Sequence, residues 1–372
     1  MTSETRRAGL RSVTAAIGMF AIGFLIVAGG IHRATPNRFA LHAAMRSEKL
    51  ALLDQWRGTA LSASFGSSHV HYGFDPRAFD AAMAGTSTPT RSINLAIAGG
   101  SQSEQRAMAL AFVESLSPQQ PAAPHAHFVF LELNAGANFT REHLLHPRAI
   151  NLYDWPTTRF VFSLTSPAMS FEQRAGRSAF ALIAMTLHFA NVGMVSSRLF
   201  PAPLDQQQLD AESIEDRRGL IVDARRPGVL EQLRLIESHA PQQPAVTPAE
   251  LLPGNRDLAE DLQAHSAVKL VKLQIVYLVM PKLSDLTHRI DYPDMLSTSQ
   301  GPIPIFNLAR PDLYPQLYAP ELWFDDAHLD ESGARLASTL LAQSLIAWQS
   351  AYAHPLPTSQ QAAAGSSEAG KP

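Results

Sequence analysis

The chain has 372 residues, of which 46% are apolar and 17% are charged, and its formal net charge is −3. Its 30 basic residues are scattered among 33 acidic ones, so no basic patch of the kind that binds nucleic acid is expected, and no nucleic-acid partner. The absence of cysteine excludes disulfides, thiol catalysis, iron–sulfur clusters and zinc sites built on thiolates.

The first distinctive segment is an uncharged run near the N-terminus. Residues 12–31 read SVTAAIGMFAIGFLIVAGGI, and a helix of about 20 residues spans the hydrocarbon core of a bilayer. Arg6, Arg7 and Arg11 precede the run, which favours an N-terminus on the cytoplasmic side. The run therefore predicts a single membrane anchor, with residues 1–11 in the cytoplasm and the rest of the chain outside it. A cleaved signal peptide and a buried helix are the alternatives.

Alternating strands and helices are expected after the anchor. Residues 32–57 are predicted to form a stalk with a helix over residues 41–56. In residues 58–353, short apolar runs alternate with helical stretches, which predicts a three-layer α/β/α domain around a central, mainly parallel sheet. The expected strands are residues 60–65, 92–98, 127–133, 272–280 and 302–308.

A large insertion is expected to interrupt this pattern over residues 140–268. Within it, residues 178–195 form an apolar helical stretch that suits a buried or interfacial helix, with a second membrane span as the alternative. A closing helix is predicted over residues 329–352. Residues 354–372 are rich in Ala, Ser and Gly, and are expected to be a disordered tail.

Polar residues follow three of the predicted strands, at the edge where parallel sheets bind their ligands. These loops contain Ser68, Gly99, Asn134 and Asn138. Near the C-terminus, Asp325 precedes His328 by three residues. An Asp at this spacing can hold one ring nitrogen of the His, which leaves the other nitrogen to take a proton from a serine. The sequence therefore contains the groups needed for acyl transfer: a nucleophile, a base, an orienting carboxylate and oxyanion donors.

The order of these motifs resembles the SGNH (GDSL-like) hydrolase superfamily. Residues 66–68 read Gly-Ser-Ser where the family has Gly-Asp-Ser, and Asn94 is followed five residues later by Gly99, as in its second motif. Residues 136–138 keep the Gly-x-Asn of its third motif but lack the Asp that follows. Residues 325–328 match its Asp-x-x-His.

The resemblance implies a role for each matching residue. Ser68 would be the nucleophile, His328 the base and Asp325 the residue that orients it. The backbone N–H of Gly99 and the side chain of Asn138 or Asn134 would form the oxyanion hole.

The serine at position 67 is similar to that of membrane-anchored family members that transfer acyl groups to cell-surface polymers. The resemblance thus implies an SGNH/flavodoxin-like fold outside the cytoplasm, acting on an ester of a surface glycan or lipid. Its expected partners are the membrane, through the N-terminal helix, and a membrane-bound acyl-donor protein. No metal or other cofactor is expected.

Each motif also has a plain structural interpretation. Ser67 and Ser68 can cap a helix, and Asp325 and Asp326 can cap the last one with His328 in its first turn. Two pairs of nearby histidines, His69 with His71 and His143 with His146, lack a third metal ligand at matching spacing. They are therefore expected to be ordinary surface or core residues.

Two functional alternatives stay open. The same residues would serve a hydrolytic esterase, with water in place of an acceptor hydroxyl. A non-catalytic binding or assembly component of a surface-polysaccharide modification system would keep the fold without the chemistry.

Overall fold

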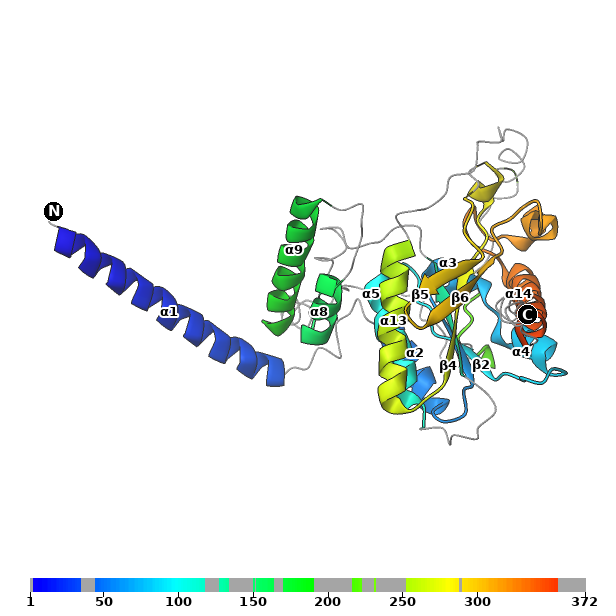
Figure 1. Ribbon diagram of the computed structural model, residues 1–372, viewed down its shortest axis with the longest axis horizontal. Helices are drawn as coiled ribbons and strands as arrows, with labels where there is room; N and C mark the ends of the chain where they lie inside the picture. The colour runs from blue at the N-terminus through cyan, green and yellow to red at the C-terminus, as the bar shows by residue number, and fades with distance from the viewer. Residues whose placement is uncertain are drawn as a thin grey trace, which may run out of the picture.

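The protein is described here from a computed structural model, which places a six-stranded, mostly parallel sheet between two layers of helices (Figure 1). The described residues are 3–34, 44–117, 127–133, 150, 152–163, 170–190, 216–222, 231, 252–287 and 290–353. The strands are β1 (Ser62–Phe65), β2 (Ser92–Asn94), β3 (His127–Glu132), β4 (Leu273–Val279), β5 (Met295–Thr298) and β6 (Gly301–Asn307). The predicted α/β class and central parallel sheet are confirmed.

The strands follow the order β2-β1-β3-β4-β6-β5. All neighbouring pairs are parallel except β5 and β6, so β5 is an antiparallel strand at the edge. Ala63 of β1 is paired with Val129 of β3, which is paired in turn with Ile275 of β4. The five parallel strands have the order of a doubly wound sheet, whose ligands bind at the carboxyl ends of the strands.

The central strands β3 and β4 each contain a run of apolar residues because both of their faces are covered. In β3, Val129 and Leu131 pack into one core and Phe128 and Phe130 into the other. The first core lies under α2 (Ala44–Gln55), α5 (Gln102–Ser115) and α13 (Leu252–Lys269). The second lies under α3 (Ser68–Gly73), α4 (Pro76–Met83) and α14 (Glu331–Ala353).

Two of these helices come from segments expected outside the sheet domain. The region predicted as a stalk forms α2, and its Leu52 and Leu53 are buried in the core. The end of the predicted insertion forms α13, which packs against α5 and β5. Both helices therefore help to cover the sheet.

Two further helices, α8 (Trp155–Ser163) and α9 (Phe171–Phe189), pack against each other beside this domain. The apolar helix expected over residues 178–195 thus begins earlier, where Ser170 forms a capping box with Gln173. Three short 3-10 helices, η3 (Leu283–Leu286), η4 (Pro315–Tyr318) and η5 (Pro320–Leu322), lie in the connections around β4, β6 and α14.

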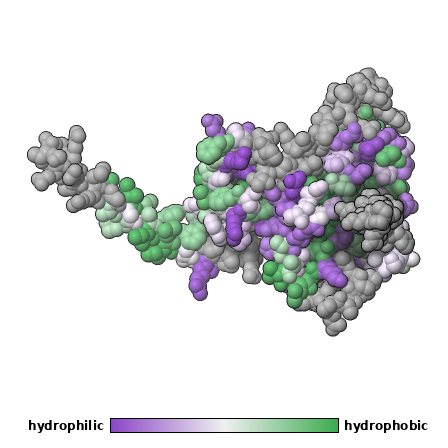
Figure 2. Space-filling view, viewed as in Figure 1, coloured by the Kyte–Doolittle hydropathy of each residue, from purple (hydrophilic) through white to green (hydrophobic). Residues whose placement is uncertain are grey.

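The N-terminal helix α1 (Ser3–Ala34) extends away from the sheet domain, and its C-terminal end meets α9, where Gly29 faces Phe189 (Figure 1). Apolar side chains are exposed along it, from Val13 to Val27 (Figure 2). Within the part of the chain that the structure describes, no helix is both long and apolar enough to cross a membrane. The predicted disordered tail, residues 354–372, lies outside the described residues.

Candidate active site

Gly66 brings the loop after β1 into contact with the end of β3. A Cβ at position 66 would lie 2.6 Å from the Cβ of Glu132 and 2.9 Å from Cγ2 of Val70. Both distances are far below a normal contact, so only glycine allows this approach. The loop that carries Ser67 and Ser68 is thereby held at the carboxyl edge of the sheet.

Ser68 is the first residue of α3 and is half-buried. Ser67 occupies the N-cap position, but its side chain makes no capping hydrogen bond. Its hydroxyl instead donates to Oε1 of Glu132 at 2.9 Å. The side chain of Ser67 therefore does not cap the helix. Within the described residues, the Ser68 hydroxyl forms no hydrogen bond.

Asp325 and His328 form the pair that their spacing predicted. Nδ1 of His328 lies 2.9 Å from each oxygen of the Asp325 carboxylate. Oδ1 of Asp325 also accepts the backbone N–H groups of Ala327 and His328, both at 2.8 Å. Burial alone would raise the pKa of Asp325, but the hydrogen bonds and charge of His328 and the Ala327 N–H hold it below its ordinary value. Asp326 is exposed.

Three aromatic rings hold the imidazole of His328 in place. Phe324 and His69 stack on it with ring centroids 5.4 Å away in each case, and Tyr72 meets it edge-on at 5.1 Å. Because a carboxylate can only accept, Nδ1 of His328 carries a proton, and in the neutral ring Nε2 then presents a lone pair. Nε2 is buried, and no described group forms a hydrogen bond with it.

The structure brings His328 to the loop of Ser68 without joining the two side chains. His69, the neighbour of Ser68, lies against the His328 ring. The hydrogen bond expected from the Ser68 hydroxyl to Nε2 of His328 is absent. Such bonds are often long without substrate and tighten only in the reacting complex.

Sequence reasoning missed Glu132, whose buried carboxylate joins Ser67 and His69. It accepts the Ser67 backbone N–H and hydroxyl, and its Oε1 lies 3.3 Å from Nδ1 of His69. Burial would raise the pKa of Glu132, but the hydrogen bond and charge of His69 and the two Ser67 donors hold it below its ordinary value. In the sequence, Glu132 was marked only by being a single acidic residue at the end of an apolar strand.

The second predicted loop lies directly on the first. The Ile97 N–H donates to the carbonyl of Gly66 at 3.0 Å, and a Cβ at Gly100 would lie 2.9 Å from that same oxygen. Gly99 is exposed, with φ of +63°. Asn94 is buried and donates from Nδ2 to three carbonyls at the end of α3, so its contacts are structural. These are the carbonyls of Val70, His71 and Phe74.

The oxyanion-hole residues predicted in the third loop, Asn134 and Asn138, lie outside the described residues. Within the described part of the chain, no group of three or more His, Asp or Glu side chains is arranged to hold a metal ion.

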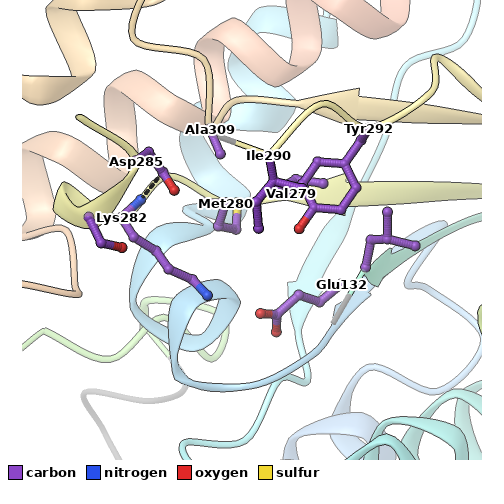
Figure 3. Close-up of a pocket in the computed structure, with 10 residues that line it drawn as sticks. Glu132, Val279, Met280, Lys282, Asp285, Ile290, Tyr292 and Ala309 are labelled. Atoms are coloured by element: carbon purple, nitrogen blue, oxygen red, sulfur yellow. Dashed lines mark hydrogen bonds between the residues drawn. The ribbon is translucent and has the colours of Figure 1, made fainter. Parts of the chain in front are cut away.

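A cavity of about 120 Å³ opens beside Glu132 at the same edge of the sheet (Figure 3). The Glu132 carboxylate, the Lys282 amino group and the Tyr292 hydroxyl extend into it. Burial, opposed by the Lys282 N–H, the Tyr318 hydroxyl and nearby positive charge, raises the pKa of Asp285 in this wall to about 6. The lining residues are Glu132, Leu133, Val279, Met280, Lys282, Ser284, Asp285, Ile290, Tyr292 and Ala309.

Comparison with known proteins gives no match: no family model, no curated protein and no solved structure is significantly similar to this chain.

Proposed function

We propose that this protein is a membrane-anchored, extracytoplasmic acyl-transfer enzyme of the SGNH type that works through an acyl-serine at Ser68. The observation that carries the proposal is the state of His328. Asp325 holds its Nδ1, and its Nε2 is buried without a hydrogen-bond partner in the described residues, beside the loop of Ser68. A buried basic nitrogen without a partner is costly for stability, which favours a catalytic explanation.

The chemistry follows from these positions. Nε2 of His328 takes the proton of the Ser68 hydroxyl while Oγ bonds to the acyl carbon. Asp325 keeps the imidazole in the reactive tautomer and stabilises the imidazolium that forms. The Gly99 N–H and the amide of Asn138 or Asn134 would stabilise the oxyanion, and an acceptor hydroxyl or water then releases the acyl group.

The fold supports the same assignment. The site lies at the carboxyl ends of parallel strands in a doubly wound sheet, where this architecture binds its ligands. The strand order also suits the finer SGNH/flavodoxin-like assignment. Two of the motif segments, the loop after β1 with Ser68 and the segment before α14 with Asp325 and His328, meet at this site.

The substrate class is drawn from the resemblance and from the cavity. Two carboxyl groups, Glu132 and Asp285, line the cavity with the Lys282 amine and the Tyr292 hydroxyl, and such a lining suits a hydroxyl-bearing acceptor. We propose a surface glycan or lipid as the acceptor or ester, with the acyl group delivered by a membrane-bound donor protein. The uncharged residues 12–31 of α1 support a single-pass anchor.

Ester hydrolysis by the full chain tests the proposal. Ser68→Ala should remove nearly all turnover of a p-nitrophenyl ester, because the nucleophile is lost. Ser64→Ala is the matched control: the Ser64 hydroxyl is buried in β1 without a hydrogen bond within the described residues, so turnover should not change. Equal turnover by Ser68→Ala and wild type would refute the role of Ser68. No wild-type turnover with any ester or acceptor would favour the non-catalytic alternative.

A further inference from the structure

A second carboxylate–imidazole pair, Glu132 and His69, lies beside the Asp325–His328 pair. The single hydroxyl proton of Ser67 is donated to Glu132 Oε1 at 2.9 Å. Nδ1 of His69, which lies 3.0 Å from the Ser67 hydroxyl oxygen and 3.3 Å from Glu132 Oε1, must therefore be a donor. His69 and His328 thus both carry a proton on Nδ1, which a carboxylate holds in each case.

The two imidazoles are coupled because their rings are stacked. Their centroids are 5.4 Å apart and their planes differ by 27°. Like charges at this distance disfavour each other, so the pair holds one extra proton far more readily than two. Catalytic sites often place two titratable groups side by side in different surroundings, so that one acts as the acid and the other as the base.

His69 is the better placed of the two rings to act as a proton donor. Its partner Glu132 is more deeply buried than Asp325, with 6% of the side chain exposed against 15%, and a buried carboxylate needs a nearby cation. The charge of Asp285 also acts on His69. A proton on Nε2 of His328, by contrast, would be buried without an acceptor in the described residues.

The remaining neighbours of the two rings are mostly uncharged. Tyr72, Phe324 and the Ser67 hydroxyl are neutral groups around the two rings. Tyr292 faces Glu132 and Asp285 across the cavity, and these two charges, together with burial, raise the pKa of its hydroxyl to about 12, so it is neutral as well. Lys282 contributes a cationic amine to the wall of the cavity that Glu132 and Asp285 also line.

We propose that His69, held by Glu132, is the acid of the acyl transfer and that His328 is its base. The proposal rests on the acyl-serine function proposed above. In the scheme with one histidine, His328 would perform every proton transfer. Here His328 exchanges a proton with Ser68, and His69 exchanges one with the leaving group or the acceptor.

The proton transfers balance over the full cycle. In acylation, His328 Nε2 takes the Ser68 proton while Oγ bonds to the acyl carbon. The bond from that carbon to the leaving oxygen then breaks, its electron pair stays on the oxygen, and His69 Nε2 supplies the proton. In deacylation the acceptor hydroxyl bonds to the acyl carbon and gives its proton to His69, while Ser68 leaves and recovers its proton from His328.

The leaving group provides the test. p-Nitrophenolate leaves without a proton, whereas an alkoxide needs one, so only alkyl esters depend on the acid. With the full chain, His69→Gln should slow the burst of p-nitrophenolate only as far as the lost ring contact disturbs His328. It should slow acylation by an alkyl ester by at least about 10²-fold more than it slows that burst. Glu132→Gln should show the same contrast, because the neutral amide no longer holds an imidazolium.

The control is His265→Gln, which removes a histidine paired with Asp261 on α13, away from the site, and should change neither rate. Equal losses of both rates in His69→Gln, or no loss of either, would overturn the proposal, and melting curves would show whether a variant is folded. If wild type gives no burst, the acyl-serine function itself fails. Imidazole ¹⁵N spectra provide a second readout: the signal lost in His69→Gln should be that of a ring protonated at Nδ1, and an unprotonated Nδ1 would contradict the proposal.

Discussion

Asp325 does more than contact His328. Its Oδ1 accepts two backbone N–H groups of its own loop, so the carboxylate is fixed before it holds the imidazole. The imidazole is fixed on its faces by Phe324 and His69. A side chain held in this way is pre-organised, and the proton transfer then needs little rearrangement.

The two neighbouring aspartates should therefore behave differently on substitution. Asp325→Asn should slow turnover by up to ~10⁴-fold, because an amide favours the wrong tautomer of His328. Asp326→Asn should leave turnover nearly unchanged, because this side chain is exposed. His328→Ala should be at least as damaging as Asp325→Asn, and combining the two should add little, since the pair acts as a unit.

Ester-hydrolysis kinetics on the four variants, with melting curves alongside, check this prediction. An inactive Asp326→Asn with an active Asp325→Asn would show that the motif is shifted by one residue.

The sequence predicted one of the two pairs at this site. Asp325 and His328 lie three residues apart, so their interaction is visible in the sequence. Glu132 and Ser67 are 65 residues apart, and only the pairing of β1 with β3 brings them together. His69 was expected to be an ordinary histidine because its pair with His71 lacks a third ligand at matching spacing. Its contact with Glu132 depends on the same strand pairing.

At the scale of elements, α2 is joined to the second loop of the site by a buried lysine. Lys49 donates from Nζ to the carbonyl of Asn94 at 2.9 Å and to that of Gly219. Burial, only partly offset by the charge of Glu48, lowers its pKa to about 7. A neutral amine still has two N–H donors for these two carbonyls, so the contact survives deprotonation.

This lysine should make the stability of the fold depend on pH. Between pH of about 7 and 10 the unfolded chain binds the Lys49 proton and the folded chain does not, so the free energy of unfolding rises with pH. The slope is at most about 1.4 kcal/mol per pH unit. Denaturant unfolding of wild type and Lys49→Met across this range measures it. Lys49→Met should lack the Lys49 contribution to the slope of the free energy of unfolding against pH. Identical slopes in the two proteins would refute the prediction.

Elements with a strong apolar pattern were predictable from the sequence, and those fixed by tertiary contacts were not. The apolar runs within β3 and β4 identified central strands. The short strand β5 was missed, since its four residues, MLST, have no distinctive pattern and depend on pairing with β6. The segment of α2 was recognised as helical, but its place against the sheet depends on Leu52 and Leu53 meeting α5.

At the scale of the whole molecule, α1 stands apart from the domain that carries the site (Figure 1). Its described side chains include Phe20, which is 76% exposed, and Ile26, which is 69% exposed. A contiguous set of exposed apolar side chains marks a surface that contacts another apolar phase. This exposure supports the proposed anchor over residues 12–31. The proposed extracytoplasmic side of the sheet domain rests on Arg6, Arg7 and Arg11, which precede the anchor.

A topology experiment checks this expectation. A reporter that is active only after export, fused to the C-terminal end of the chain, should be active, and one that works only in the cytoplasm should be silent. Replacing Phe20 and Ile26 together by lysine should release the chain from the membrane fraction, because charged residues at a helix centre oppose insertion. The control replaces Arg6 by lysine, which keeps the flanking charge. A strongly active cytoplasmic reporter would contradict the proposed orientation.

The central claim, that Ser68 becomes acylated, is tested most directly by mapping the adduct of a fluorophosphonate on the full chain by peptide mass spectrometry. An activated serine displaces fluoride and keeps the phosphonyl group, so the site of attack is recorded in a peptide mass. We predict one modified residue, Ser68, in wild type and almost no modification in His328→Ala. An adduct on Ser67 instead, or equal labelling of wild type and His328→Ala, would contradict the account.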